Sequence, residues 1–178
     1  MKIDFRQQLD FNNVLIRPQR TTISSRSEVS LDRTFYFKNS NTNWTGVPII
    51  ASNMDTIGTF NVSEVLNKYK MLTCLNKFYS VVEYHSFLSQ KKNELNLKDY
   101  TEYIKNIVIS VGIGKDDIIK LHKVLNIFPE IQWICIDVAN GYMNKMVTIC
   151  KTIRKKYPNK IIIAGNVATG EMTQELII

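Results

Sequence analysis

Five short apolar runs recur along the chain, each followed by a more polar stretch with helical character. The runs are rich in β-branched residues and are nearly continuous rather than alternating, which is typical of parallel strands covered on both faces. They occupy residues 47–52, 71–75, 107–112, 133–139 and 161–167. The pattern therefore predicts five strands of a parallel sheet, separated by helices.

The polar stretches carry the start and stop signals of helices. Asn61 and Ser80 are each followed three residues later by a glutamate, the pattern of a capping box. Segments 115–129 and 142–158 both end at a proline, which cannot continue a helix. A further helix is expected to begin after Thr169. Strand and helix thus alternate five times, which makes this an α/β chain.

Two α/β architectures fit this order, a doubly wound nucleotide-binding sheet and an incomplete (β/α)8 barrel. The turn after the first run contains a single glycine, and the segment GIGKDD at Gly112 lacks the third glycine of a dinucleotide fingerprint. Strand order distinguishes the two, because a doubly wound sheet reverses its order and a barrel does not. Residues 90–105, the most polar interior stretch, are expected to form a surface excursion.

Composition excludes several classes of protein. The 178 residues are 44% hydrophobic and 22% charged, which is ordinary for a soluble globular protein. No apolar run approaches the roughly 20 residues of a membrane span, and the N-terminus lacks the apolar core of a signal peptide. A cytoplasmic protein without a membrane or nucleic-acid partner is expected. The net charge is +7, but the basic residues are scattered along the chain. Their densest cluster, residues 151–160, is interpreted as the solvated end of a helix.

Polar residues or glycines close every run, and carboxyl ends of parallel strands open on one face of the fold. They are Asn53 and Asp55, Asn76 and Lys77, Gly112 and Gly114, Asp137 and Asn140, and Gly165 and Asn166. Each alone has a structural explanation as a helix cap, a turn or a solvated lysine, but their shared position indicates a ligand site. Lys77 and Asp137 could there relay a proton or bind a polar cofactor group.

The remaining candidate residues are expected to be structural. Cys74, Cys135 and Cys150 have no spacing typical of metal ligands, so they are interpreted as small core residues and no metal site is expected. His85 and His122 lie in amphipathic helical segments and are interpreted as surface residues.

Five segments resemble, in order, the N-terminal half of the GMP reductase family, and the resemblance covers essentially all 178 residues. They are LDFNNVLIRPQRTTISSRSEVSL, GVPIIASNMDTIGTF, NKFYS, CIDVANGY and AGNVATGEM. The sister family, IMP dehydrogenase, typically carries a regulatory domain of over a hundred residues after the second barrel strand, where this chain has only about 30. That family also tends to have Ser-Ser-Gln-Gly where residues 138–141 here read Val-Ala-Asn-Gly. Both departures favour the reductase.

The resemblance implies a partial (β/α)8 TIM barrel of about five βα units, with helices on the outer face. Residues 1–45 would precede the barrel and residues 46–178 would form units 1 to 5 of one domain. It also implies an enzyme, usually a homo-tetramer, that uses NADPH to convert GMP into IMP and ammonia.

The resemblance also implies roles for individual residues. Lys77 and Asp137 would line the nicotinamide side of the pocket and manage the departing ammonia and its proton. We further expect them to stand on adjacent strands, close enough for one nicotinamide to touch both. The further residues implied are Val138 and Ala139 beside the nicotinamide, Ser25 and Arg26 against the cofactor of a neighbouring subunit, and Asn53 and Met54 beneath the purine. Asn76 stands where the family usually has histidine.

The family's nucleophile is a cysteine on a glycine-rich loop after the sixth strand, and none of the three cysteines here lies in such a loop. The 178-residue chain alone is therefore expected to be inactive. The alternatives are a non-catalytic half-barrel that binds a nucleotide or a partner chain, and an oxidoreductase of the IMP dehydrogenase type.

Overall fold

The computed structural model describes residues 3, 5–7 and 9–177, and these fall into two compact units, Met1–Ser30 and Leu31–Ile178. In the first unit the described residues are exposed and form two short 3₁₀ helices, η1 (Phe11–Asn13) and η2 (Arg26–Glu28). The side chain of Asp10 caps η1. The first unit therefore has no core of its own among its described residues.

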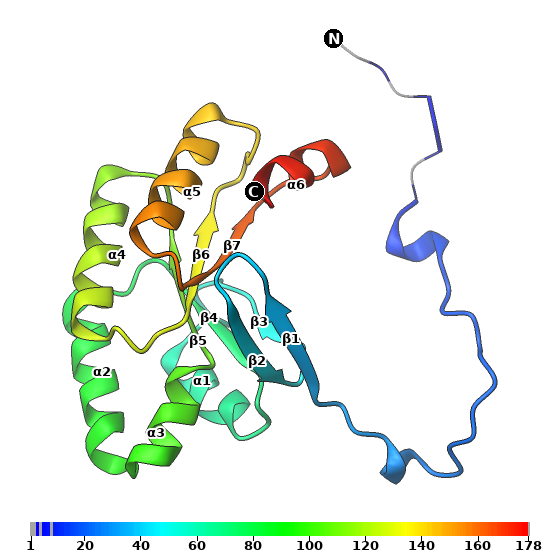
Figure 1. Cartoon of the computed structure of the whole chain (residues 1–178), viewed down its shortest axis with the longest axis horizontal. Helices are drawn as coiled ribbons and strands as arrows, with labels where there is room; N and C mark the ends of the chain where they lie inside the picture. Colours follow the sequence, from blue (N-terminus) through cyan, green and yellow to red (C-terminus); the bar gives the residue numbers. More distant parts are fainter. Residues whose placement is uncertain (1–2, 4, 8, 178) are drawn as a thin grey trace. The chain divides into compact units, whose positions relative to one another are not determined.

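The second unit is built on a five-stranded parallel sheet whose spatial order, β3-β4-β5-β6-β7, follows the sequence (Figure 1). The strands are β3 (Ile50–Ala51), β4 (Leu72–Leu75), β5 (Ile107–Val111), β6 (Trp133–Asp137) and β7 (Ile161–Gly165). A doubly wound sheet would reverse its order at a switch point, so this alternative is excluded. The sheet has the strand arrangement of a partial (β/α)8 barrel, as predicted.

Helices cover one face of this sheet. They are α1 (Phe60–Asn67), α2 (Val81–Glu94), α3 (Leu97–Ile104), α4 (Lys115–Ile127), α5 (Asn144–Lys156) and α6 (Gly170–Leu176). Ile109 and Ile134, which are fully buried, belong to the cluster that joins α1–α5 to the sheet. None of the helices in the described residues is long and apolar enough to cross a membrane.

An antiparallel hairpin, β1 (Arg33–Phe37) and β2 (Thr42–Gly46), packs against the opposite, inner face. Its Trp44 is 5% exposed and packs with residues near the amino ends of the strands, including Trp133. The two tryptophan rings lie edge to face, with their centroids 6.0 Å apart. The indole Nε1 donates a hydrogen bond to Oδ1 of Asn106 at 2.9 Å. The hairpin therefore closes the inner face at the amino ends of the strands and leaves the carboxyl ends for a site.

Several predicted helix boundaries are confirmed. Ser80 and Glu83 form the predicted capping box at the start of α2, with the Ser80 amide donating to the carboxylate at 2.7 Å. Helices α4 and α5 each end just before the prolines that were expected to stop them, and Thr169 caps α6. Local sequence signals are therefore sufficient at these ends.

Two predicted boundaries and one predicted excursion are wrong. The first run was predicted as a strand over residues 47–52, but only Ile50–Ala51 pair with β4, because this edge run contains a proline and begins in a turn. Helix α1 is capped by Thr59, whose Oγ1 accepts from the Val62 amide, and not by Asn61. Residues 90–105 end α2 and form α3, whose Tyr100, Tyr103 and Ile104 are buried.

Replacing Trp44 by alanine is expected to lower the free energy of unfolding by about 3–5 kcal/mol, because a large buried side chain and its hydrogen bond are lost. Urea unfolding followed by circular dichroism measures this change. Tyr36, 62% exposed on the same hairpin, supplies the matched control, and Tyr36→Ala should change stability far less. Equal effects of the two substitutions would show that the hairpin does not support the sheet.

Candidate functional site

The candidate site lies at the carboxyl edge of the parallel sheet, as the sequence predicts. Lys77 follows β4 by two residues, Asp137 is the last residue of β6, and Asn53 follows β3 by two residues. Because all five strands run in the same direction, their ends open on the same side of the sheet (Figure 1). The fold therefore brings the predicted residues of the second unit to one edge.

Lys77 and Asp137 do not stand on adjacent strands, so this part of the prediction is wrong. Strand β5 lies between β4 and β6 and pairs with both. Two strand spacings correspond to roughly 10 Å. Among the described residues no hydrogen bond or ion pair joins the two side chains. A ligand that contacts both must span the end of β5.

The end of β4 is fixed by Asn76, which is 5% exposed. Its Nδ2 donates to the carbonyl of Gly58 at 3.1 Å, and its Oδ1 accepts from the amide of Phe78 at 3.1 Å. Lys77 is half-buried, and its Nζ lies 5.9 Å from the centre of the Phe78 ring. No carboxylate pairs with this ammonium among the described residues, so Lys77 can receive an acceptor from a ligand.

The backbone after Asp137 is bonded to the end of β7. The amide of Val138 donates to the carbonyl of Gly165 at 2.9 Å, and the amide of Asn166 donates to the carbonyl of Val138 at 2.7 Å. The amide of Gly141 donates to the carbonyl of Asn166 at 2.9 Å. A Cβ at Gly141 would lie 2.5 Å from that same carbonyl oxygen, so only glycine permits this approach.

Tyr142 ties the same two segments together through its side chain. Its hydroxyl accepts from the amide of Ala168 at 2.9 Å and donates to Oγ1 of Thr169 at 3.3 Å. These hydrogen bonds, that of Thr169 first, lower the pKa of the Tyr142 phenol. The sequences IDVANGY and AGNVATG, with 21 residues between them, are therefore one structural unit at the edge of the sheet.

The inner wall below the edge is polar, and its central residue was missed by the sequence analysis. Ser110 of β5 is fully buried, and its Oγ accepts from Nδ2 of Asn53 at 2.8 Å. Cys74 and Cys135 belong to the same cluster on this wall, and their mutual interaction raises the pKa of Cys74 and lowers that of Cys135. The one signal in the sequence was a serine inside an otherwise apolar run.

Asp137 lies two residues beyond Cys135 on the same face of β6. The neighbouring Cys74 lowers the pKa of Cys135, and the charge of Asp137 opposes part of that effect. The carboxylate is half-buried and makes no hydrogen bond or ion pair within the described residues. It is therefore a charged group at the mouth whose hydrogen-bonding capacity is open to a ligand.

The glycines of the GIGKDD segment do not cradle a phosphate. The carboxylate of Asp117 accepts from the amide of Gly114 at 3.1 Å and lies 2.6 Å from where a Cβ at Gly112 would be. The space above the glycines is thus filled by this chain's own carboxylate, which caps α4. The weakness of the fingerprint in the sequence has a structural reason.

The other predicted residues are placed as follows. Met54 is 58% exposed beside the mouth. Ser25 and Arg26 lie in the first unit, where the Ser25 hydroxyl accepts from the amide of Ser27 and caps η2. Within the described residues no group of three His, Cys, Asp or Glu side chains could hold a metal ion.

The two histidines differ from each other. His85 is exposed, as expected, with its ring near that of Phe128. His122 is half-buried, and its Nδ1 is 2.8 Å from the hydroxyl of Tyr157, so it is less exposed than His85. Its hydrogen bond bridges α4 and the end of α5, and neither histidine lies at the mouth.

Comparison with known proteins gives a consistent result. The model of the IMP dehydrogenase / GMP reductase domain matches residues 8–178. GMP reductase of Buchnera aphidicola subsp. Schizaphis graminum is 46% identical over 178 residues, which are all of this chain and 49% of the relative. GMP reductase 2 of Bos taurus is 44% identical over 99% of this chain and 48% of its own length. The chain spans about half the length of these curated relatives.

A solved structure supports the fold. The crystal structure of inosine 5′-monophosphate dehydrogenase from Legionella pneumophila superimposes with a TM-score of 0.69 over 96% of this chain and 47% of that protein. The sequence identity is 23%, so this similarity concerns the fold alone.

Removing the charge of Asp137 is expected to increase the rate at which iodoacetamide alkylates Cys135 by about threefold near neutral pH. Cys74 lowers the pKa of Cys135 and the Asp137 carboxylate opposes this shift, so Asp137→Asn should lower the pKa further and enlarge the reactive thiolate fraction. Peptide mass spectrometry of timed samples measures the rate at each cysteine.

Asp55→Asn, at an exposed carboxylate after β3, supplies the control and should leave the rate unchanged. Cys150 on α5 serves as an internal reference in both variants. An unchanged Cys135 rate in Asp137→Asn would show that the carboxylate does not face the inner wall.

Proposed function

Because the chain belongs to the IMP dehydrogenase / GMP reductase family, we propose that it is part of an enzyme that reductively deaminates GMP to IMP and ammonia with NADPH. The observation that carries this proposal is the 41–46% identity, over essentially the whole chain, to relatives named GMP reductase. The connection between β4 and β5 supports the same choice, since it consists of α2 and α3 and holds no inserted domain.

Lys77 and Asp137 are proposed to bind the reacting groups from either side of β5. NADPH would supply the hydride. Asp137 and the backbone of Val138 and Ala139 would orient the nicotinamide, since this segment is held to β7 by the hydrogen bonds of Gly165 and Asn166. The Asp137 carboxylate and the Lys77 ammonium would hold and move the proton of the departing ammonia. Neither group has an ion-pair or side-chain hydrogen-bond partner among the described residues, which fits this role.

Asn53 and Met54 are proposed to lie beneath the purine. The hydrogen bond to buried Ser110 fixes the amide of Asn53, so its orientation is set before a ligand arrives. Met54 exposes its thioether side chain, which suits contact with a flat ring.

The 178-residue chain alone is proposed to be catalytically silent. The covalent chemistry of the family requires a cysteine on a glycine-rich loop at the mouth. Cys74 lies in β4, Cys135 in β6 and Cys150 in α5, so none occupies a loop. The nucleophile would be supplied by the part of the relatives that this chain does not span.

The complete protein is proposed to work in the cytoplasm as a homo-oligomer, a tetramer by family resemblance. Ser25 and Arg26 would then contact the cofactor bound by a neighbouring subunit, where the guanidinium suits the phosphates of the adenosine half. Both side chains belong to the exposed first unit, which is compatible with a role between subunits.

A second candidate is a non-catalytic half-barrel that binds a nucleotide or a partner chain. One observation favours it: β3 and β7 each pair on only one side within the described residues. Ile50 of β3 and the preceding Ile49 are also exposed. Open parallel edges favour association with another chain.

The purified chain is expected to show no GMP-dependent oxidation of NADPH, measured as absorbance at 340 nm after intact mass confirms its length. Turnover by this chain would contradict the assignment of the nucleophile to another segment. Co-expression with the C-terminal half of a relative should restore oxidation if the reductase assignment is correct.

The chain is expected to bind NADPH, followed by nucleotide fluorescence, with Lys77→Gln weakening affinity about tenfold, since hydrogen bonds to charged groups are worth roughly 1.5–3 kcal/mol. Lys123→Gln, at an exposed lysine of α4, is the matched control and should have no effect. Equal affinities for all three proteins would remove Lys77 from the proposed site.

A further inference from the structure

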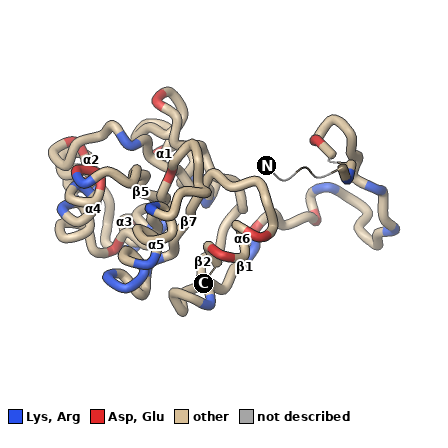
Figure 2. The backbone as a smooth tube through the Cα atoms, turned by 90° about the horizontal axis from the view of Figure 1, so that it is seen from above, with Lys and Arg blue, Asp and Glu red and all other residues tan. Residues whose placement is uncertain are grey.

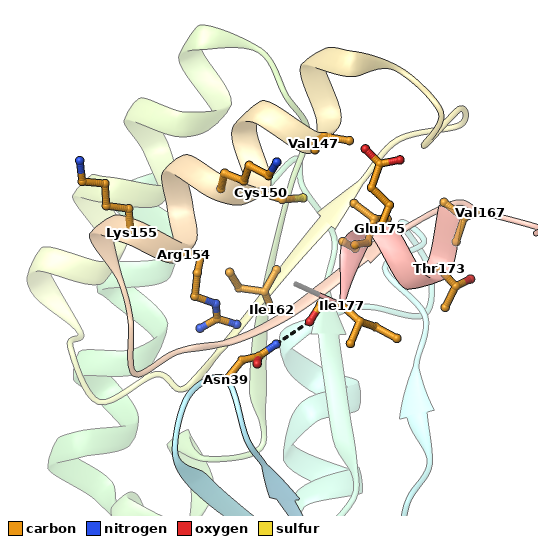
Figure 3. A pocket seen from close by; sticks show the side chains of 13 residues that line it. Asn39, Val147, Cys150, Arg154, Lys155, Ile162, Val167, Thr173, Glu175 and Ile177 are labelled. Atoms are coloured by element: carbon orange, nitrogen blue, oxygen red, sulfur yellow. Dashed lines mark hydrogen bonds between the residues drawn. The ribbon is translucent and has the colours of Figure 1, made fainter. Parts of the chain in front are cut away.

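A cavity of about 600 Å³ lies between α5, α6 and the outer face of β7 (Figure 3). Its apolar lining includes Val147 and Cys150 of α5, Ile162 and Ala164 of β7, and Leu176 of α6. Side chains alternate across a strand, so Ile162 and Ala164 point away from the inner wall to which Cys135 and Asp137 belong. The cavity is therefore separate from the candidate site at the mouth, and its volume is that of a small-molecule site.

The charged lining of the cavity is mainly basic. Lys151, Arg154 and Lys155 come from α5, and Glu175 of α6 is the one acidic side chain among the described residues that line the cavity. Lys and Arg residues are distributed along several helices (Figure 2), but the last turn of α5 carries three in succession. No ion pair neutralises Lys151 or Arg154 within the described residues. The cavity thus combines an apolar floor with uncompensated positive charge.

Arg154 is held in place by the backbone that follows α5. Its Nη1 donates to the carbonyls of Pro158 at 3.1 Å and Lys160 at 2.7 Å. Figure 3 shows the guanidinium directed past Ile162 towards Asn39, within the hollow rather than out to solvent. Burial lowers the pKa of Arg154, so an anion beside it would offset the loss of hydration.

The wall opposite α5 is helix α6, which buries little of its own surface and is held by a hydrogen bond at its end. Helix α6 buries only Met172 among its described residues. The carbonyl of Ile177, just after α6, accepts a hydrogen bond from Nδ2 of Asn39 in the β1–β2 turn at 2.8 Å. This hydrogen bond holds the end of α6 beside the cavity. The cavity is therefore bounded by α5, α6 and β7, and Asn39 links α6 to the β1–β2 turn.

We propose that this cavity binds a small amphiphilic anion, with its apolar body on Ile162 and Ala164 and its anionic group beside Lys151 and Arg154. The apolar floor does not suit a polyanion such as nucleic acid, which needs a row of cations along its path. A neutral apolar ligand would leave the guanidinium without a counter-charge. The proposal does not depend on the reductase function.

The test uses two probes with the same ring system, 8-anilinonaphthalene-1-sulfonate, which is anionic, and N-phenyl-1-naphthylamine, which is neutral. Fluorescence titrations are made on the full chain and on Lys151→Gln. The substitution is expected to weaken sulfonate binding roughly fivefold, the effect of about one exposed ion pair. Binding of the neutral probe should be unchanged, since the ring contacts remain.

Lys145→Gln is the matched control, because Lys145 is an exposed lysine of α5 that does not line the cavity. Location is tested independently by alkylation of Cys150, a lining residue, with peptide mass spectrometry. The sulfonate probe should slow labelling of Cys150 at least threefold and leave Cys135 on the opposite face unaffected. Circular dichroism verifies that each variant is folded.

Three results would overturn the proposal. One is failure of the sulfonate probe to bind the folded chain at all. Another is equal weakening of both probes by Lys151→Gln, or an equal effect of Lys145→Gln, because the positive charge would then not select the ligand. The third is binding without protection of Cys150, which would place the probe elsewhere.

Discussion

The alternation of side chains across the parallel strands β4–β7 is the constraint on which the rest of the structure depends. On the outer face Ile109 and Ile134 pack against the helices, and each is fully buried. On the inner face the paired positions on β5 and β6 are Ser110 and Cys135, with Asp137 two residues further along. A shift of one residue in register would exchange these two sets, and the polar wall would be buried beneath the helices.

The inner face is itself divided along the strands. At their amino ends it is closed by Trp44, which rests on Trp133 and is fixed to Asn106. At their carboxyl ends the hydrogen bonds of Tyr142 and Gly141 join the segments after β6 and β7 into one rim. The hairpin stabilises the amino ends of the strands, and the rim at their carboxyl ends carries the groups that a ligand can reach. Stability and binding therefore depend on opposite ends of the same strands.

The sequence predicts much of this because the signals are local. Apolar runs locate β4–β7 to within two residues, and caps and prolines locate helix ends. Pairing at a distance is not encoded in that way. The packing of Trp44 on Trp133 joins residues 89 positions apart. The contact of Ser110 with Asn53 was hidden in an apolar run, and the separation of Lys77 from Asp137 follows from β5 lying between their strands.

The central claim, that the rim after β4 and β6 is the nucleotide-facing part of the chain, is tested most directly by NMR. Amide shifts of the ¹⁵N-labelled chain are recorded during titration with NADPH. The account predicts changes concentrated at residues 76–78, 137–142 and 165–169, with the amides of residues 150–156 on α5 unmoved. Changes concentrated along α5, or no change at Asp137 and Val138 at saturation, would contradict it.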